Sequence, residues 1–168
     1  MQSFAHGSVP LPAARDITQR VLSLLSGAAS TTDIGTNEIN RAMGINLAPD
    51  PEAGKGWSIF ESPDLGFGWH FGVQHADPKP PLKPSLRFWF EHESGDADPT
   101  PVCSLPVDHL RSMLASHGWV ERTVPTEIGS VLGLEFAKRE LVLVLTPRDI
   151  ARSGDVQCII SLQVSGGH

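Results

Sequence analysis

The spacing of hydrophobic residues changes near residue 57, and this change limits the fold more than any other feature of the sequence. Up to that point, apolar residues recur every three or four positions, as in Ile17, Val21 and Leu25. Beyond it they recur mainly at every second position, as in Phe88 and Phe90. The first spacing lines one side of a helix, and the second lines one face of an antiparallel strand. The sequence therefore predicts helices before residue 57 and mainly strands after it, with one further helix among the strands.

Three helices are expected, over residues 12–26, 37–43 and 106–118. Pro12 suits the first turn of the first helix, because its missing N–H would have no partner there. Thr36 is predicted to cap the second helix, and Gly44 to end it in the left-handed conformation. In the third helix Leu105 precedes the first turn as a hydrophobic staple, and Gly118 ends it.

Seven strands are expected, over residues 57–60, 68–73, 86–91, 120–124, 132–137, 141–146 and 156–164. The segment from Leu141 to Leu145 is apolar on both faces, which indicates a central strand. Together the elements predict an α+β fold in which two or three helices cover one face of an antiparallel sheet of about six or seven strands.

The domain organisation follows from the same pattern. Residues 1–11 show no periodicity and are expected to form a flexible N-terminal arm, and residues 12–168 are expected to form a single domain. The order of a helix and then strands occurs twice in the chain, so we expect two halves with the same plan.

The formal net charge of −6 disfavours nucleic acid and anionic membrane surfaces as partners. It suits a cationic protein partner. No apolar stretch is long enough to span a bilayer, so no membrane span is predicted.

Two features bear on the compartment. Ser3 and Ala5 place small residues at the −3 and −1 positions of a signal-peptidase site, so we expect a periplasmic or otherwise exported protein whose leader is missing from this sequence. The alternative is a chance triplet in a cytoplasmic protein. A disulfide between Cys103 and Cys158 would fit export and would stabilise the fold by about 4 kcal/mol, because it closes a long loop. Two buried free thiols are the alternative reading, and we favour the disulfide.

Known catalytic and metal-binding motifs are missing from the sequence. It has no Gly-x-Ser-x-Gly elbow, no Cys-x-x-Cys and no His-Glu-x-x-His. His70 and His75 are predicted to point to opposite faces of a strand, and Glu91-His92-Glu93 reads as solvated residues at a strand end. The glycines between residues 66 and 72 are assigned to a turn or bulge. We therefore expect a protein that is not an enzyme and that uses no metal or cofactor.

The candidate binding surface consists of Trp89 and the charged residues that flank it in the sequence. Alternation places Trp89 on the opposite face from Phe88 and Phe90, where an exposed aromatic beside an arginine is a good anchor for a protein partner. Acidic residues that follow can steer a cationic partner. The alternatives are a second layer that covers Trp89 and an acidic stretch that is only a soluble loop. The predicted binding residues are Arg87, Trp89, Glu91, Glu93, Asp96 and Asp98.

Residues 103–164 have a distinctive layout: Cys103 precedes an amphipathic helix, Gly118-Trp119 closes that helix, and Cys158 lies in the last strand. This layout resembles that of small periplasmic immunity proteins, which bacteria pair with antibacterial effectors of the type VI secretion kind. This resemblance implies an inhibitor without enzymatic activity that occludes the active site of a cognate toxin, such as a cell-wall hydrolase or lipase. The helix-then-strands halves are also similar to tandem folds of the β-lactamase-inhibitor type. The alternatives are an exported envelope or scaffold domain, and a small-ligand carrier or an enzyme with a scattered site.

Overall fold

The computed structural model describes residues 10–77, 79, 83–104, 106–122, 134–149 and 157–166, and for residues 148, 149 and 157 it describes the backbone alone. The first nine residues of the expected arm lie outside this description, as do Leu105 and the predicted strand positions 123–124, 132–133 and 156. Within the described part of the arm, Leu11 donates its backbone N–H to the Pro101 carbonyl at 2.8 Å and packs against the core.

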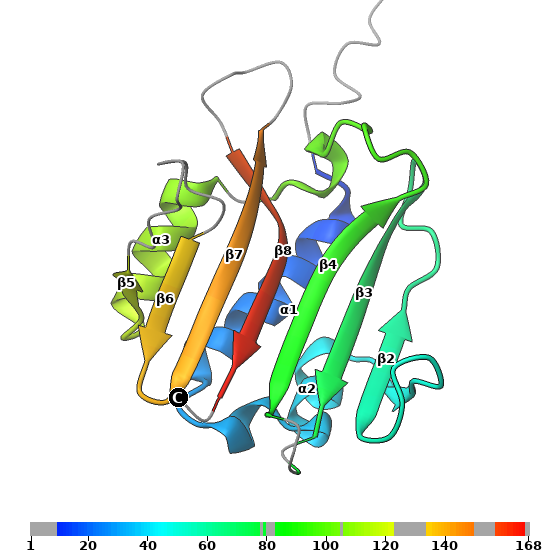
Figure 1. Ribbon diagram of the computed structural model, residues 1–168. Coiled ribbons are helices and arrows are strands. Elements are labelled where there is room, and N and C mark those ends of the chain that lie inside the picture. Colours follow the sequence, from blue (N-terminus) through cyan, green and yellow to red (C-terminus); the bar gives the residue numbers. More distant parts are fainter. Residues whose placement is uncertain are drawn as a thin grey trace, which may run out of the picture.

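The described chain forms one antiparallel sheet in the order β1-β2-β3-β4-β8-β7-β6-β5 (Figure 1). Its strands are β1 (Ala48–Pro49), β2 (Trp57–Glu61), β3 (Trp69–Ala76), β4 (Ser85–His92), β5 (Val120–Arg122), β6 (Leu134–Lys138), β7 (Leu141–Asp149) and β8 (Gln157–Ser165). The predicted antiparallel sheet is confirmed, but it has eight described strands where six or seven were expected. The additional strand is β1, which at two residues is too short to show alternation.

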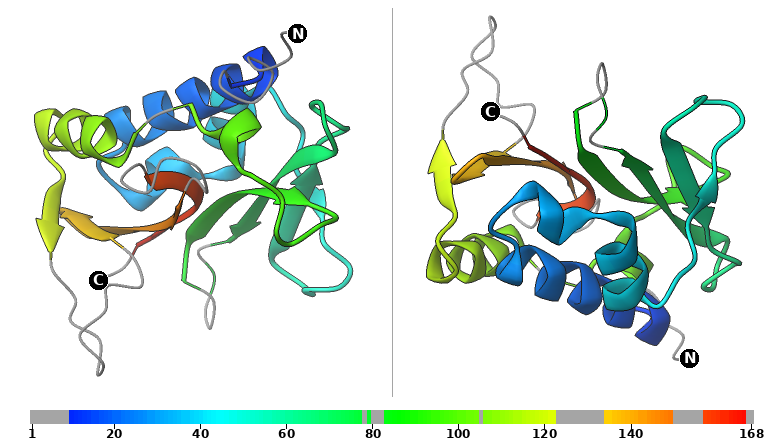
Figure 2. Two further views of the ribbon diagram at one scale, coloured as in Figure 1. Left: turned by 90° about the horizontal axis from the view of Figure 1, so that it is seen from above. Right: turned by 90° about the horizontal axis from the view of Figure 1, so that it is seen from below.

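Three α-helices cover one side of this sheet, as Figure 2 shows from above and below. They are α1 (Pro12–Gly27), α2 (Thr36–Met43) and α3 (Val107–Ser116), and two 3-10 turns, η2 (Thr31–Ile34) and η3 (Thr100–Val102), accompany them. The α+β class and the helices on a single face are therefore as predicted.

The helix ends depend on local chemistry. Pro12 occupies the first turn of α1, and Gly44 ends α2 with a left-handed φ of 70°, both as predicted. The predicted cap by Thr36 is wrong, because Gly35 is the N-cap residue and Thr36 is already helical. The Thr36 Oγ1 lies instead 3.3 Å from Nδ1 of the buried His75.

The core lies between the helices and the covered face of the sheet. Ile17, Val21 and Leu25 of α1 and Phe88 and Phe90 of β4 are all buried, which fulfils the two spacings seen in the sequence.

Strand β7 lies between β6 and β8, as the prediction of a central strand requires. Leu143 and Leu145 are at most 1 % exposed, but Val144 between them is 38 % exposed. The predicted central position is therefore confirmed, and Val144 is an apolar residue on the open face of the strand. The second face of the sheet carries no helix among the described residues (Figure 1).

Two meanders build the sheet. Strands β1 to β4 pair in chain order, strands β5 to β8 do the same, and the last strands of the two runs, β4 and β8, pair with each other. Leu86 lies opposite Val164 and Phe88 opposite Leu162 in this central pairing. The expected plan of two helix-then-strands runs thus describes the topology.

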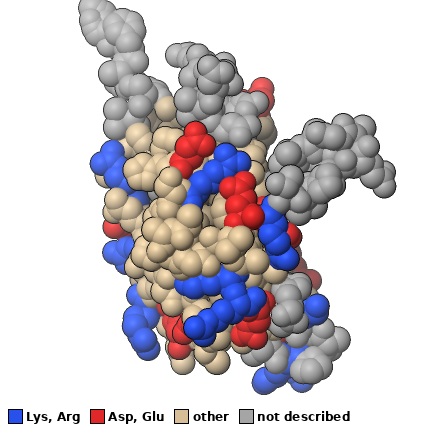
Figure 3. Space-filling model, turned by 90° about the vertical axis from the view of Figure 1, so that its left-hand side faces the viewer, with Lys and Arg blue, Asp and Glu red and all other residues tan. Residues whose placement is uncertain are grey.

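Charge protects the β5 edge of the sheet. Arg122 Nε lies 3.3 Å from Glu135 Oε2, and Arg111 Nε of α3 lies 3.1 Å from Glu121 Oε1. Figure 3 shows basic and acidic side chains interspersed on this side of the molecule. A short strand with alternating charges is a poor template for pairing with another chain.

Candidate functional site

Trp89 lies on the helix-free face of the sheet, half-buried, between the buried Phe88 and Phe90 of the same strand. Its indole lies across Gly72, its partner on β3, so closely that a Cβ at that position would overlap the ring. The guanidinium carbon of Arg87 is 5.2 Å from the ring centroid, which is a cation–π contact. The indole therefore contacts a glycine and an arginine, on a sheet face over which no helix lies among the described residues (Figure 1).

Next to Trp89 an acidic hollow opens at the end of β4. We use this name for the hollow of about 420 Å³ that is lined by Glu61, Ser62, His70, Glu91, His92 and Glu93. The three glutamates are exposed, and within the described residues none of them forms an ion pair. The hollow therefore presents three carboxylates and no cation of its own.

Hydrogen bonds fix both histidines of the acidic hollow. The Ser94 backbone N–H donates to His92 Nδ1 at 2.9 Å, so the ring proton lies on Nε2, which donates to the Phe67 carbonyl at 2.8 Å. His70 Nδ1 lies 3.1 Å from the Ser62 carbonyl and must carry the proton that this bond requires.

A tight turn at residues 66–68 lies next to the acidic hollow, where His92 bonds to the Phe67 carbonyl. Phe67 occupies this turn with a φ of 54° and is 64 % exposed, between Gly66 and Gly68, which also have positive φ. Positive φ is unusual for a bulky residue and is a sign of a conformation that its surroundings impose. The prediction of a turn or bulge is confirmed for Gly66 and Gly68, but it is wrong for Gly72, which lies inside β3 and pairs in regular register with Trp89. Sequence reasoning missed Phe67.

Three contacts hold the turn. Asp64 Oδ1 accepts the Gly66 N–H at 2.6 Å, and the His92 bond fixes the Phe67 carbonyl. The Leu11 side chain packs so closely on Gly66 that a Cβ there would lie 3.0 Å from it.

The structure separates the six predicted binding residues into two groups. Arg87, Trp89 and Glu91 form one row on the open face of β4, and Glu93 lines the acidic hollow. The other two residues lie in the loop after β4.

Both loop aspartates take part in local hydrogen bonds. Asp96 accepts a bond from Ser94 Oγ. Asp98 accepts bonds from the Thr100 N–H at 3.0 Å and the Thr100 hydroxyl at 2.7 Å, which stabilises the start of η3.

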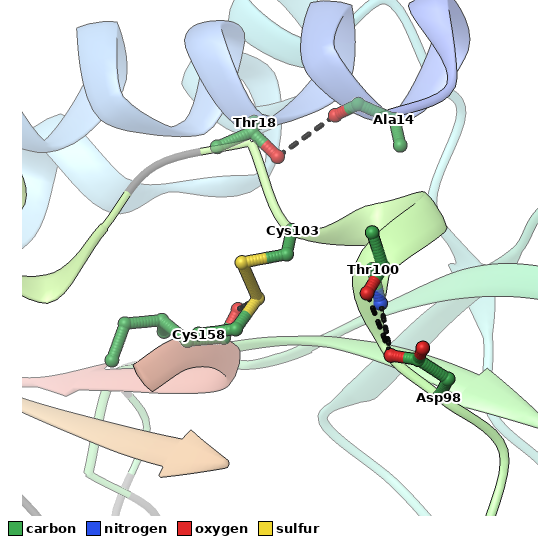
Figure 4. The surroundings of a disulfide bond; sticks show 7 residues. Ala14, Thr18, Asp98, Thr100, Cys103 and Cys158 are labelled. Atoms are coloured by element: carbon green, nitrogen blue, oxygen red, sulfur yellow. Dashed lines mark hydrogen bonds between the residues drawn. A yellow bond between two sulfur atoms is a disulfide. The ribbon is translucent and has the colours of Figure 1, made fainter. Parts of the chain in front are cut away.

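The predicted disulfide is present. Cys103, which follows η3, is bonded to Cys158 in β8, with a Cα–Cα distance of 5.4 Å (Figure 4). Cys158 is 1 % exposed. The bond attaches the segment between η3 and α3 to a central strand of the sheet.

A small apolar cavity of about 30 Å³ lies between α1 and β4, with Val21, Phe88 and Leu162 among its lining residues. The Ser104 hydroxyl borders it and is buried, with no hydrogen-bond partner among the residues that the structure describes.

No group of three or more His, Cys, Asp or Glu side chains in the described residues is arranged to hold a metal ion. No helix found there has the length and apolarity that a membrane crossing needs. Comparison with family models, with curated proteins and with solved structures gave no match to this chain.

Proposed function

We propose that this protein is a binding domain without enzymatic activity, and that it acts as an immunity protein that occludes a secreted toxin or hydrolase. The arrangement around Trp89 carries the proposal. An aromatic ring held on an open sheet face, with Arg87 over it and Glu91 beside it, has the chemistry of an interface anchor.

The indole is ordered before any partner arrives. Gly72 below the ring and Arg87 above it restrict its rotamers, so little side-chain entropy is lost on binding. The strands on either side hold the backbone rigid. These features favour binding by a preformed surface over binding by a mobile loop.

Charge indicates the kind of partner. The net charge of −6 and the three carboxylates of the acidic hollow favour a partner with a basic cleft and disfavour nucleic acid. Substrate-binding clefts of hydrolases that act on anionic polymers are of this kind, so a domain placed over such a cleft would exclude the substrate.

The disulfide supports a place outside the cytoplasm. Such bonds persist in oxidising compartments, of which the bacterial periplasm is one. An immunity protein that meets an incoming cell-wall hydrolase or lipase acts in that compartment.

The experiment is an affinity capture from the periplasm and culture medium of the native organism, with the purified protein as bait under non-reducing conditions. The proposal expects one identified enzyme at near-stoichiometric yield, displaced by free protein, whose activity falls as the complex forms. A captured enzyme that stays fully active would contradict inhibition. Repeated captures without a partner would contradict protein binding.

A further inference from the structure

The turn that carries Phe67 has a property that folding alone does not explain. Phe67 is 64 % exposed at the tip, in a left-handed backbone conformation that is unfavourable for a residue with a Cβ. Asparagine or glycine would occupy the same position with less strain. Strained, exposed residues of this kind concentrate at ligand-binding sites.

The turn is also preformed. Leu11 packs on one of its glycines, His92 holds the Phe67 carbonyl, and Asp64 holds the Gly66 N–H. The ring is therefore presented on a fixed backbone, and its insertion into a pocket requires no further ordering of the chain.

The neighbouring charges distinguish a protein partner from a membrane. An exposed aromatic ring can enter a lipid surface, but Glu61, Glu91 and Glu93 beside this turn would be repelled by anionic headgroups. The same carboxylates would attract an ammonium or guanidinium group.

We propose that Phe67 is an anchor that inserts into an apolar pocket of a protein partner, and that the acidic hollow receives a lysine or arginine side chain from the rim of that pocket. This inference rests on the proposed function and names the chemistry of its partner. The contact would then lie on the open face of the sheet, where β3 begins and β4 ends, next to Trp89.

The acidic hollow is tested first with N-acetyl-arginine amide as the probe, in a titration of the isotopically labelled protein followed by NMR. Saturable shifts at the amides of Glu61, His70 and Glu91 are expected. They should be absent with the uncharged N-acetyl-citrulline amide and in the double variant Glu61→Gln/Glu91→Gln. Equal shifts at the distant Glu135 would show a general charge effect and would overturn the claim.

Phe67 is tested with the partner identified by the capture experiment. Phe67→Asn removes the ring but keeps a residue that tolerates positive φ, so the turn and the thermal stability should be retained. The affinity should fall at least about tenfold, as it does for a hot-spot aromatic. The matched control is Val120→Ser, because Val120 is also 64 % exposed but lies on β5 at the other edge of the sheet, and its affinity should change less than about twofold.

Each outcome separates the two proposals. If no complex forms, the proposed function fails and the anchor fails with it. If a complex forms and Phe67→Asn binds it as tightly as the unaltered protein, only the anchor is overturned. Binding of the unaltered protein to phosphatidylglycerol or phosphatidylcholine vesicles that is lost in Phe67→Asn would overturn the protein anchor in favour of a membrane contact.

Discussion

The Trp89 indole lies directly over Gly72 on the adjacent strand, where the backbone has no side chain to displace it. This pairing allows a large aromatic ring to lie flat on an open sheet face and remain half-buried. The shape of the candidate binding surface thus depends on Gly72, because any side chain at that position would displace the indole.

Replacing Gly72 with alanine should therefore shift the Trp89 indole and lower the stability of the fold. The new methyl group must push the Trp89 ring outward, and we expect a loss of about 1–3 kcal/mol in the free energy of unfolding because the site is overpacked. Denaturant unfolding measures the loss, and NMR of the indole N–H reports the ring's new position. Gly27→Ala is the control, since a Cβ there meets no atom within 4 Å. Equal unfolding free energies for the two variants would contradict the packing account.

Much of this fold could be predicted because burial imposes a period on the sequence. The alternation of Phe88, Trp89 and Phe90 correctly assigned the two faces of β4, and the glycine after α2 correctly marked its end. Strand β1 was missed because two residues have no period. The cap at Thr36 was predicted wrongly because a threonine and the glycine before it both suit an N-cap. The contact of the Thr36 hydroxyl with the distant His75 could not be seen in the sequence.

The site was less predictable for a different reason. The acidic hollow joins residues of β2, β3 and β4 that only strand register brings together. A phenylalanine between two glycines reads as part of a turn, and neither its exposure nor its positive φ follows from a hydrophobic pattern. Asp98 was read as a binding residue from its charge, although its spacing to Thr100 also fits the local bonds that it forms.

Removal of the disulfide should lower stability substantially. Cys103 and Cys158 are 55 residues apart, and the entropy of the unfolded chain predicts a loss of about 4 kcal/mol when the bond is reduced. Chemical denaturation with and without dithiothreitol measures it. The variant Cys103→Ala/Cys158→Ala should be weakened by a similar amount and should not respond to the reductant. A loss below about 1 kcal/mol in the unaltered protein would contradict a stabilising role.

Stability should fall in mild acid because of His75. Burial lowers the pKa of this side chain below its usual 6.5, and nearby Asp77 and the Ile34 backbone offset this in part. The folded state thus disfavours the protonated ring, so its contribution is complete above about pH 6.5 and is lost as the pH falls through the lowered pKa. Unfolding measured between pH 7.5 and 5 should show this decrease. His75→Asn should show a flatter profile in that window, and an unchanged slope would contradict the assignment.

Trp119, in the second half of the chain, should stabilise the fold through its contact with α1 of the first half. This side chain is 2 % exposed, and its Nε1–H donates to the Leu25 carbonyl at the end of α1 at 3.1 Å. Trp119→Phe removes the donor and part of the ring, and we expect the free energy of unfolding to fall by about 2 kcal/mol. Trp57→Phe, at a half-buried edge position, should cost clearly less in the same denaturant titration. A reversed order of the two variants would be inconsistent with the structure.

The central claim is that Trp89 and its neighbours bind a protein partner, and the most direct test is calorimetric titration of that partner with two variants of the same face. Trp89→Ala should weaken binding by about 2 kcal/mol or more, which is about thirtyfold in the dissociation constant. Val144→Ala, on β7 of the same open face, should leave it within about twofold. If Trp89→Ala stays folded and binds as tightly as the unaltered protein, this surface is not the binding site.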